Sequence, residues 1–431
     1  MVGPGVRAAG YDGLMIHGRS DIPVYLWIKD GHVEVRDARH YWGKLSGEVQ
    51  DGLEQELGDK RIRVLQTGIA GERGVRFAAI VNQLKHFHGR GGLGAVMGSK
   101  NLKAVAVRGS KPPVAVDKAR AKGQLVWFKE HYDRAKDRFH QLGSSSAVLA
   151  LEASGILPTR NFRDGSFEGA RAISGQTMRD TILTDRGTCY ACAVACKREV
   201  EVKELGVTPK YGGPEYESLA ASGSLCGVSD LNKLALVNQL YAQYVLDSIS
   251  TGAVIAFAME CYEHGIITRA MTGGLELTWG NADAVIQLAH LIGKREGIGR
   301  VLGEGVKRAA AELAGGPSGL RSTSRARSCP CTTRGARRGS RWPTPSPRLE
   351  PTTWRRPTTR STQASIPRAI PWACWASSSR SIRSTSTPGR CGRSSRPRRC
   401  GAATTRSACA TSSARRSTAW SCSRWSTTSM R

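Results

Sequence analysis

The chain has 431 residues, with 64 Lys and Arg against 35 Asp and Glu, and a formal net charge of +29. Residues 321–431 contain 24 Arg, no Lys and a single acid, Glu350, so they carry +23, whereas residues 1–320 carry only +6. The body therefore has the charge of an ordinary enzyme, and the total gives no support to a nucleic-acid partner. No stretch approaches the roughly 18 apolar residues of a membrane span, and no signal peptide is recognisable, so we expect a cytoplasmic protein without a membrane partner.

Residues 10–110 are predicted to be rich in strands. Residues 23–29 and 32–36 alternate apolar and polar side chains around Asp30-Gly31, which is a strong hairpin signal. A helix is expected over residues 45–57 from its periodicity. The other predicted strands are residues 61–68, 75–81 and 102–107.

From about residue 115 onward, apolar residues recur at helical spacing. The predicted helices are residues 117–142, 144–152, 230–245, 250–264, 282–294 and 299–313. The expected fold class is α+β, with a β-rich domain over residues 1–112 and a helical domain over 113–316. Residues 317–431 are rich in Arg, Ser and Thr and poor in aliphatic residues, so we expect this tail to be disordered.

Cys189, Cys192 and Cys196 form the sharpest motif, with C-x2-C-x3-C spacing. A loop thiolate and two thiolates one helical turn apart can converge on one iron–sulfur cluster. Zinc is the competing metal, although structural zinc sites more often use two separated pairs of ligands, and small buried cysteines without a ligand role are the third alternative. A cubane cluster needs a fourth ligand, for which Cys226 and Cys261 are candidates.

A glycine-rich motif occupies residues 86–103 and includes Gly89, Gly91 and Gly92. Glycines let backbone N–H groups approach a ligand closely, and Arg90 and Lys100 add charge suited to phosphate. The motif is neither a dinucleotide-binding fingerprint nor a P-loop. An anion- or cofactor-binding loop and a tight structural turn are therefore both open.

Two further motifs carry polar side chains. Glu215 and Glu217 lie two residues apart in a predicted turn, where they are either functional carboxylates or an ordinary solvated pair. Residues 246–252 are predicted to separate two helices, with Ser250 or Thr251 as the N-cap of the second helix.

Taken in order, these motifs resemble the aldehyde ferredoxin oxidoreductase family of tungsten enzymes. The resemblance extends over roughly residues 5–316. The stretches that carry it include Ala9-Gly-Tyr-Asp-Gly13, Gly89-Arg-Gly-Gly-Leu-Gly-Ala-Val-Met-Gly98, Cys189-Tyr-Ala-Cys192, Gly213-Pro-Glu-Tyr-Glu-Ser218, Leu246-Asp-Ser-Ile-Ser-Thr-Gly252 and Trp279-Gly-Asn281.

The resemblance implies a tungsten, less often molybdenum, ion held by two pterins, and a nearby [4Fe–4S] cluster that passes electrons to ferredoxin. It implies oxidation of a small aldehyde to a carboxylate, a magnesium ion bridging the pterin phosphates, and a homodimer as one option. An aryl-acid or acyl-CoA reductase subunit is the alternative within the family. A basic nucleic-acid-binding protein, driven by the tail, is the alternative from another class.

Individual roles follow from the resemblance by position. It implies that Cys189, Cys192 and Cys196 bind the cluster and that Glu217 is a catalytic carboxylate that moves protons near the metal. The implied pterin contacts are Gly89, Arg90, Gly91, Gly92, Leu246 and Asp247.

The sequence also departs from the family pattern. Ala242 and Val245 stand where the family commonly has polar and glycine residues, and the chain opens within the family's first domain, as if truncated. In a shifted reading frame, Arg327-Ser-Cys-Pro-Cys-Thr-Thr-Arg-Gly335 can spell a family motif, so we interpret the tail as a frameshift product. The chain as it stands is then expected to lack a cluster ligand and to be inactive. The DNA sequence around codons 308–330 tests this interpretation.

Overall fold

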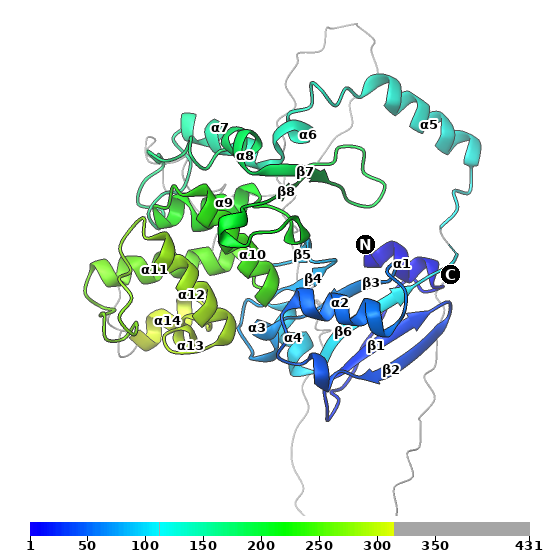
Figure 1. The fold of residues 1–431 in the computed structure, drawn as a ribbon, viewed down its shortest axis with the longest axis horizontal. Helices are drawn as coiled ribbons and strands as arrows, with labels where there is room; N and C mark the ends of the chain where they lie inside the picture. The colour runs from blue at the N-terminus through cyan, green and yellow to red at the C-terminus, as the bar shows by residue number, and fades with distance from the viewer. Residues whose placement is uncertain (112, 314–431) are drawn as a thin grey trace, which may run out of the picture. The chain divides into compact units, whose positions relative to one another are not determined.

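The computed structural model describes residues 1–111 and 113–313 of the protein. The predictions made for residues 317–431, a disordered tail with a frameshifted sequence, lie outside the described residues. Within them the fold is α+β, as predicted, with a large sheet in the first third of the chain and helices after it (Figure 1). None of the helices in these two ranges is both long and apolar enough to cross a membrane.

A six-stranded sheet dominates the first 111 residues. Its strands lie in the order β2-β1-β6-β3-β4-β5, and β1 pairs with β6 in parallel while the other neighbouring strands are antiparallel. The strands are β1 (Val24–Lys29), β2 (His32–Asp37), β3 (Arg63–Gln66), β4 (Ile80–Asn82), β5 (His86–His88) and β6 (Leu102–Arg108).

The predicted hairpin is confirmed as β1 and β2. Asp30 and Gly31 both have positive φ, 45° and 91°, as a two-residue turn of this type requires, and Lys29 pairs with His32 across it. The predicted strand over residues 75–81 is wrong for residues 75–79, since β4 begins only at Ile80. The Ala79 N–H there bonds to the Val245 carbonyl, so this segment is held by the helical region instead of a strand neighbour.

Both faces of the sheet are covered. Tyr25 and Trp27 of β1 pack on Val49 and Leu53 of α2 on one side. Ile28, Val105 and Val107 pack on the other side with residues of α1 and α4. This alternation along β1 and β6 buries both faces of these two strands. The helices of this part are α1 (Val2–Ala8), η1 (Arg39–Tyr41), α2 (Ser46–Glu56), α3 (Ile69–Glu72) and α4 (Leu93–Ser99).

The second part is mainly helical and contains one small sheet of β7 (Leu183–Gly187) and β8 (Lys197–Val200) (Figure 1). Its α-helices are α5 (Lys118–His131), α6 (Arg138–Leu142), α7 (Ala147–Ala153), α8 (Gly175–Thr181), α9 (Tyr216–Ser222), α10 (Leu231–Tyr244), α11 (Ser248–Glu263), α12 (Ala282–Lys294), α13 (Gly299–Leu302) and α14 (Val306–Leu313). Its 3-10 helices are η2 (Ser144–Ser146), η3 (Lys203–Leu205), η4 (Pro209–Tyr211) and η5 (Ser224–Cys226).

Two of the predicted helices are interrupted. The helix predicted over residues 117–142 breaks at Tyr132, whose backbone is extended, and resumes as α6 with Asp137 as its N-cap. The helix predicted over 299–313 divides near Gly305, which has a φ of 83°. In contrast, α12 has the predicted bounds, because Asn281 caps it and one continuous apolar face drives it into the core.

The main hydrophobic core joins helices α9 to α14 with part of the first region. Every residue of α11 from Ser250 to Met259 is buried, so this helix is central. Ile69, Val75 and Phe77, which come from the sheet region, belong to the same core. The Phe77 carbonyl also accepts a hydrogen bond from the Asp247 N–H at 3.2 Å, so the segment before β4 lies at the start of α11, which matters for the site.

Candidate functional site

A cavity of about 280 Å³ lies where the loop after β5 meets β8 and the beginnings of α9 and α11. Among its lining residues are six that the sequence singled out, namely Gly89, Arg90, Glu215, Glu217, Leu246 and Asp247. Four separate stretches of the chain contribute to it. The structure therefore brings the glycine-rich motif, the Glu215–Glu217 turn and the helix break together, as a shared binding site requires.

Gly91 and Gly92 are not among the lining residues of the cavity. Gly92 is the N-cap of α4 with a φ of 72°, and a Cβ on it would lie 2.2 Å from the Arg76 carbonyl oxygen. This glycine is thus required by close backbone packing, which is the structural alternative that the motif left open.

Asp247 is the polar centre of the cavity and is only 4% exposed. Its carboxylate accepts hydrogen bonds from the backbone N–H groups of Ile249 and Ser250, at 3.2 and 3.3 Å, and from the Ser250 hydroxyl. Asp247 is therefore the N-cap of α11, and the prediction of Ser250 or Thr251 in that role is wrong. The same carboxylate lies 3.5 Å from Nε of Arg90. A helix N-terminus stabilises this buried negative charge.

Two lysine–glutamate pairs border the cavity. Lys85 Nζ lies 2.6 Å from Glu199, and Lys197 Nζ lies 2.9 Å from Glu215, which also accepts a hydrogen bond from the Ser144 hydroxyl. Burial opposes protonation of Lys197, but Glu215 outweighs burial and raises the pKa of Lys197. Glu215 is thus not an ordinary solvated carboxylate.

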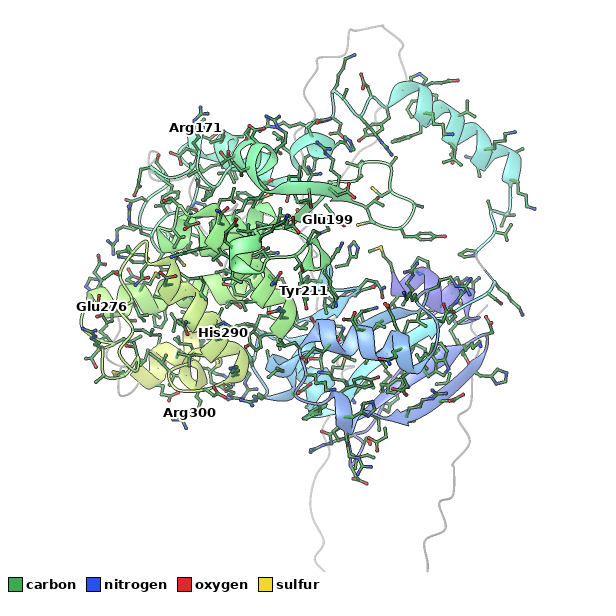
Figure 2. All side chains as sticks on the ribbon, viewed as in Figure 1. Arg171, Glu199, Tyr211, Glu276, His290 and Arg300 are labelled. Carbon is green, nitrogen blue, oxygen red and sulfur yellow. The ribbon has the colours of Figure 1, made fainter. Side chains whose placement is uncertain are left out.

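Glu199 of β8 and Tyr211 of η4 lie on the side of the helical part that is nearest to β5 (Figure 2).

The three cysteines lie in the turn between β7 and β8, residues 188–196, which we call the cysteine loop. Cys189 and Cys196 are half-buried and Cys192 is exposed. The loop contains no helix, and Ala191 and Ala195 have φ values of 53° and 50°, so the predicted helical turn between Cys192 and Cys196 is wrong. Within residues 1–111 and 113–313, no three His, Cys, Asp or Glu side chains are close enough to hold a metal ion.

The chemistry of the cysteine loop nevertheless fits an iron–sulfur cluster. Its three free thiols are the donor type that such clusters use. Burial and the nearby Glu215 raise the pKa of Cys196. Cys189 Sγ lies 3.8 Å from Nδ1 of His86, a histidine whose pKa is lowered to about 4 by burial and by Lys197, which keeps it neutral.

Cys226 and Cys261 do not extend this donor set. Both are buried in the helical core, and the Cys226 thiol donates to the Ala221 carbonyl oxygen at 3.4 Å. Burial raises the pKa of both thiols, to about 12 for Cys261. Each behaves as a small core residue and not as the fourth ligand that the sequence allowed.

Sequence reasoning missed several residues of the cavity. They are Lys85, Phe87, Lys197, Arg198, Tyr211, Asn238 and Tyr241. Lys197 and Arg198 follow Cys196 directly, so their place beside the motif was a usable signal. Asn238 and Tyr241 lie inside α10, where nothing in the helical pattern distinguishes them from core residues.

Comparison with known proteins identifies the family. Residues 1–109 match the model of the aldehyde ferredoxin oxidoreductase N-terminal domain, and residues 124–324 match the model of its domains 2 and 3. The chain belongs to the aldehyde ferredoxin oxidoreductase family. The family resemblance drawn from the motifs is confirmed.

The relatives of this chain differ in the activities that their names describe. The chain is 39% identical over 322 residues to a tungsten-containing aldehyde ferredoxin oxidoreductase of Pyrococcus abyssi. This match covers 73% of this chain and 52% of the relative. It is 36% identical over 326 residues to the WOR-like subunit of an aliphatic sulfonate oxidoreductase of Pyrococcus furiosus, covering 72% and 51%. The chain spans about half the length of the curated relatives it matches.

Among solved structures, the chain resembles the active site complex of benzoyl coenzyme A reductase with 1,5-dienoyl-CoA. The TM-score is 0.62 at 28% identity, and the match covers 72% of this chain and 48% of that chain.

Proposed function

We propose that this chain supplies the cofactor cavity and the cluster loop of a tungsten-pterin oxidoreductase that oxidises aldehydes to carboxylates. One observation carries the proposal: three separate motifs of the family line one cavity, and Lys197, which borders that cavity, directly follows Cys196 of the cysteine loop. The identity to tungsten-containing aldehyde ferredoxin oxidoreductases supports the choice of metal and substrate.

In this proposal Gly89, Arg90, Leu246 and Asp247 would hold a pterin, and Gly91 and Gly92 would shape the turn beside it. Gly89 suits this role because a Cβ there would stand 3.5 Å from the Asp247 carboxylate, on the cavity side. The cations Arg90 and Lys85 suit an anionic group. The metal held by the pterins supplies the two-electron chemistry when it is bound.

The reaction joins an aldehyde and water to give a carboxylate, two electrons and three protons. Glu217, in the first turn of α9, lines the cavity and is the carboxylate proposed to accept a proton as water adds to the aldehyde carbon.

Cys189, Cys192 and Cys196 are proposed to bind the [4Fe–4S] cluster, with ferredoxin as the electron acceptor in the cytoplasm. A magnesium ion at the pterin phosphates, molybdenum in place of tungsten, and a homodimer belong to the same proposal as family options. We also propose a domain boundary near residue 112, which is supported by the gap between the two family models at residues 109 and 124.

A second candidate is a reductase subunit that delivers electrons to an aromatic acyl-CoA. The similarity to the benzoyl coenzyme A reductase complex favours it. Phe87, Tyr211 and Tyr241 at the cavity could contact an aromatic ring. A panel of aldehydes and aromatic thioesters, assayed in both redox directions, separates the two candidates.

Aldehyde-dependent reduction of a viologen dye tests the proposal. Two proteins produced with tungstate are compared: the chain as it stands, and a chain whose coding frame after residue 316 is restored. We expect turnover only from the restored protein, and its loss in the restored Glu217→Gln variant. A restored protein that contains tungsten but oxidises no aldehyde would overturn the proposed function.

A further inference from the structure

Four consecutive carbonyl groups of the cysteine loop accept hydrogen bonds from side chains outside it. Arg134 Nε donates to the Ala193 carbonyl at 3.1 Å, and His140 Nδ1 lies 2.7 Å from the Val194 carbonyl. Arg198 donates to the carbonyls of Ala195 and Cys196, at 3.1 and 3.2 Å. The backbone from residue 193 to 196 is therefore held at every peptide unit.

Arg198 is the central donor of this set. It is 2% exposed, and it also donates to the carbonyls of His140 and Gln141 of α6, at 3.0 and 2.9 Å. Four of the five N–H groups of one guanidinium thus join the end of the cysteine loop to the end of α6. A buried cation that is satisfied by backbone carbonyls fixes the positions of both segments, because any displacement leaves it unsolvated.

Two glycines make room for this arrangement. Gly143, just after α6, has a φ of 66°, and a Cβ on it would lie 2.8 Å from the Cys196 carbonyl oxygen and 3.0 Å from Arg198 Nε. A Cβ on Gly213, at the cavity, would lie 3.1 Å from Cβ of Arg198. The side chain thus occupies a close-fitting slot between the cysteine loop and the cavity.

We infer that Arg198 is a positioning residue that fixes the conformation in which the cysteine loop presents Cys196. The inference rests on the proposed function, because that proposal has the cysteine loop bind a cluster. Arg198 acts on the cysteine loop through the backbone carbonyls to which it donates. Arg134 and His140 extend the same restraint to residues 193 and 194.

Alkylation of the individual cysteines tests the inference on the full chain without metal. We expect Arg198→Gln to speed alkylation of the half-buried Cys196 at least about tenfold, which is the change that even one lost hydrogen bond to a charged group produces. The exposed Cys192 should be unchanged, and the buried Cys226 and Cys261 should stay protected. Peptide mapping by mass spectrometry measures all of them in one experiment.

Two variants act as controls. Arg198→Lys keeps the charge but loses the planar guanidinium, so we expect an intermediate rate of alkylation at Cys196. If Arg198→Gln does not fold, the Arg198→Lys variant tests the positioning role. Arg179→Gln removes an exposed arginine that pairs with its neighbour Asp180, and it should leave every rate unchanged. An unchanged Cys196 rate, or equal acceleration of all the cysteines in both Arg198 variants, would overturn the inference.

Incubation with iron and sulfide distinguishes this inference from the proposed function. If neither the unmodified chain nor the chain with its frame restored after residue 316 binds iron at the cysteine loop, while Arg198→Gln still exposes Cys196 selectively, the proposed function fails and the positioning role stands. If iron binds and Arg198→Gln matches the unmodified chain in both iron uptake and Cys196 alkylation, the positioning role fails and the proposed function stands.

Discussion

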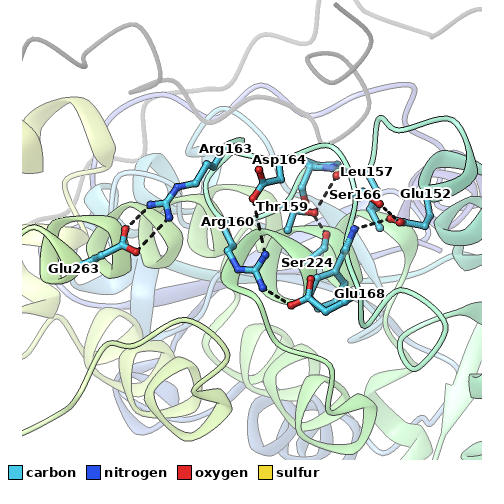
Figure 3. Close-up of polar contacts among 12 residues, drawn as sticks. Glu152, Leu157, Thr159, Arg160, Arg163, Asp164, Ser166, Glu168, Ser224 and Glu263 are labelled. Atoms are coloured by element: carbon cyan, nitrogen blue, oxygen red, sulfur yellow. Dashed lines mark hydrogen bonds and ion pairs between the residues drawn. The ribbon is translucent and has the colours of Figure 1, made fainter. Parts of the chain in front are cut away.

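Two loops of the helical region are held in different ways. The loop of residues 157–168, which we call the ion-pair loop, contains arginine–carboxylate ion pairs as well as hydrogen bonds from Ser166 and from the Phe167 N–H to Glu152 (Figure 3). Arg163 pairs with Glu263 of α11, and Arg160 pairs with Asp164 and Glu168. In the cysteine loop the cations instead bind backbone carbonyls, and the loop's own side chains are left for other partners.

The difference shows what each loop can do. Ion pairs at the surface neutralise one another, and water can replace them at little cost. A backbone held by a buried guanidinium is costly to disturb, yet it leaves three thiols in place. The second arrangement is the one that a ligand-binding loop needs, because its ligands are positioned before any metal arrives.

The largest effect expected from this comparison is in thiol reactivity. Cys192 of the cysteine loop should react with iodoacetamide at least about 100-fold faster than Cys261 of α11, because Cys261 is buried and its pKa is raised to about 12. Mass-spectrometric mapping of the native chain measures both rates. The denatured chain should show comparable rates, and similar rates in the native chain would contradict the described burial.

Replacing Asp247 should have the next largest effect, on the stability of the fold. We expect Asp247→Ala to lower the free energy of unfolding by about 2 kcal/mol, because it removes the N-cap of α11 and the carboxylate beside Arg90. Urea unfolding measures the change. Asp247→Asn keeps a capping oxygen and should cost less than about 1 kcal/mol. Equal losses in the two variants would show that the cap contributes nothing.

Replacing Glu215 tests its ion pair with Lys197, the lysine that follows the cysteine loop and borders the cavity. Glu215→Gln should destabilise the chain by about 1.5 kcal/mol, since Lys197 is half-buried and loses its charged acceptor. The pKa of Lys197 should fall in the same variant, because Glu215 is what raises it. Urea unfolding and the pH dependence of Lys197 acylation are the measurements. An unchanged acylation profile would contradict the pairing.

The ion-pair loop should give the smallest effect. Arg163→Ala is expected to cost less than about 1 kcal/mol, because both partners are partly solvated. The hydrogen bond from Arg163 lowers the pKa of Glu263, so the contribution is present above the ordinary glutamate pKa of 4.5 and is lost as the pH falls below it. Urea unfolding at pH 7 and pH 4 measures it. A larger loss at pH 4 would reverse the expected sign.

Local signals in the sequence predicted the local features of the fold. The Asp30-Gly31 turn fixed the first hairpin, and the apolar face of residues 282–294 fixed α12. The β7–β8 hairpin was not predicted, because the spacing of Cys192 and Cys196 also matches a helical turn. Ser250 looked like a cap because serine is a common one, whereas the structure begins the helix earlier, after Asp247.

The sequence predicted the motifs of the site but not the tertiary contacts between them. The cysteines, Gly89 and Glu217 each stood out by residue type and spacing, whereas Asp247 was implied only by the family resemblance. The approach of Arg90 to Asp247 depends on tertiary packing between residues far apart in the chain. Arg198 could not be predicted as a positioning residue, because its partners are backbone carbonyls and no side-chain pattern records them.

Iron–sulfur reconstitution tests the central assignment most directly. The full chain and a variant with Ser at positions 189, 192 and 196 are incubated anaerobically with iron and sulfide, reduced, and compared by electron paramagnetic resonance and by iron and sulfide content. We expect a cluster signal from the unmodified chain that a chelator removes readily, and no such signal from the serine variant. Equal iron and equal spectra in the two proteins would contradict a cluster at the cysteine loop.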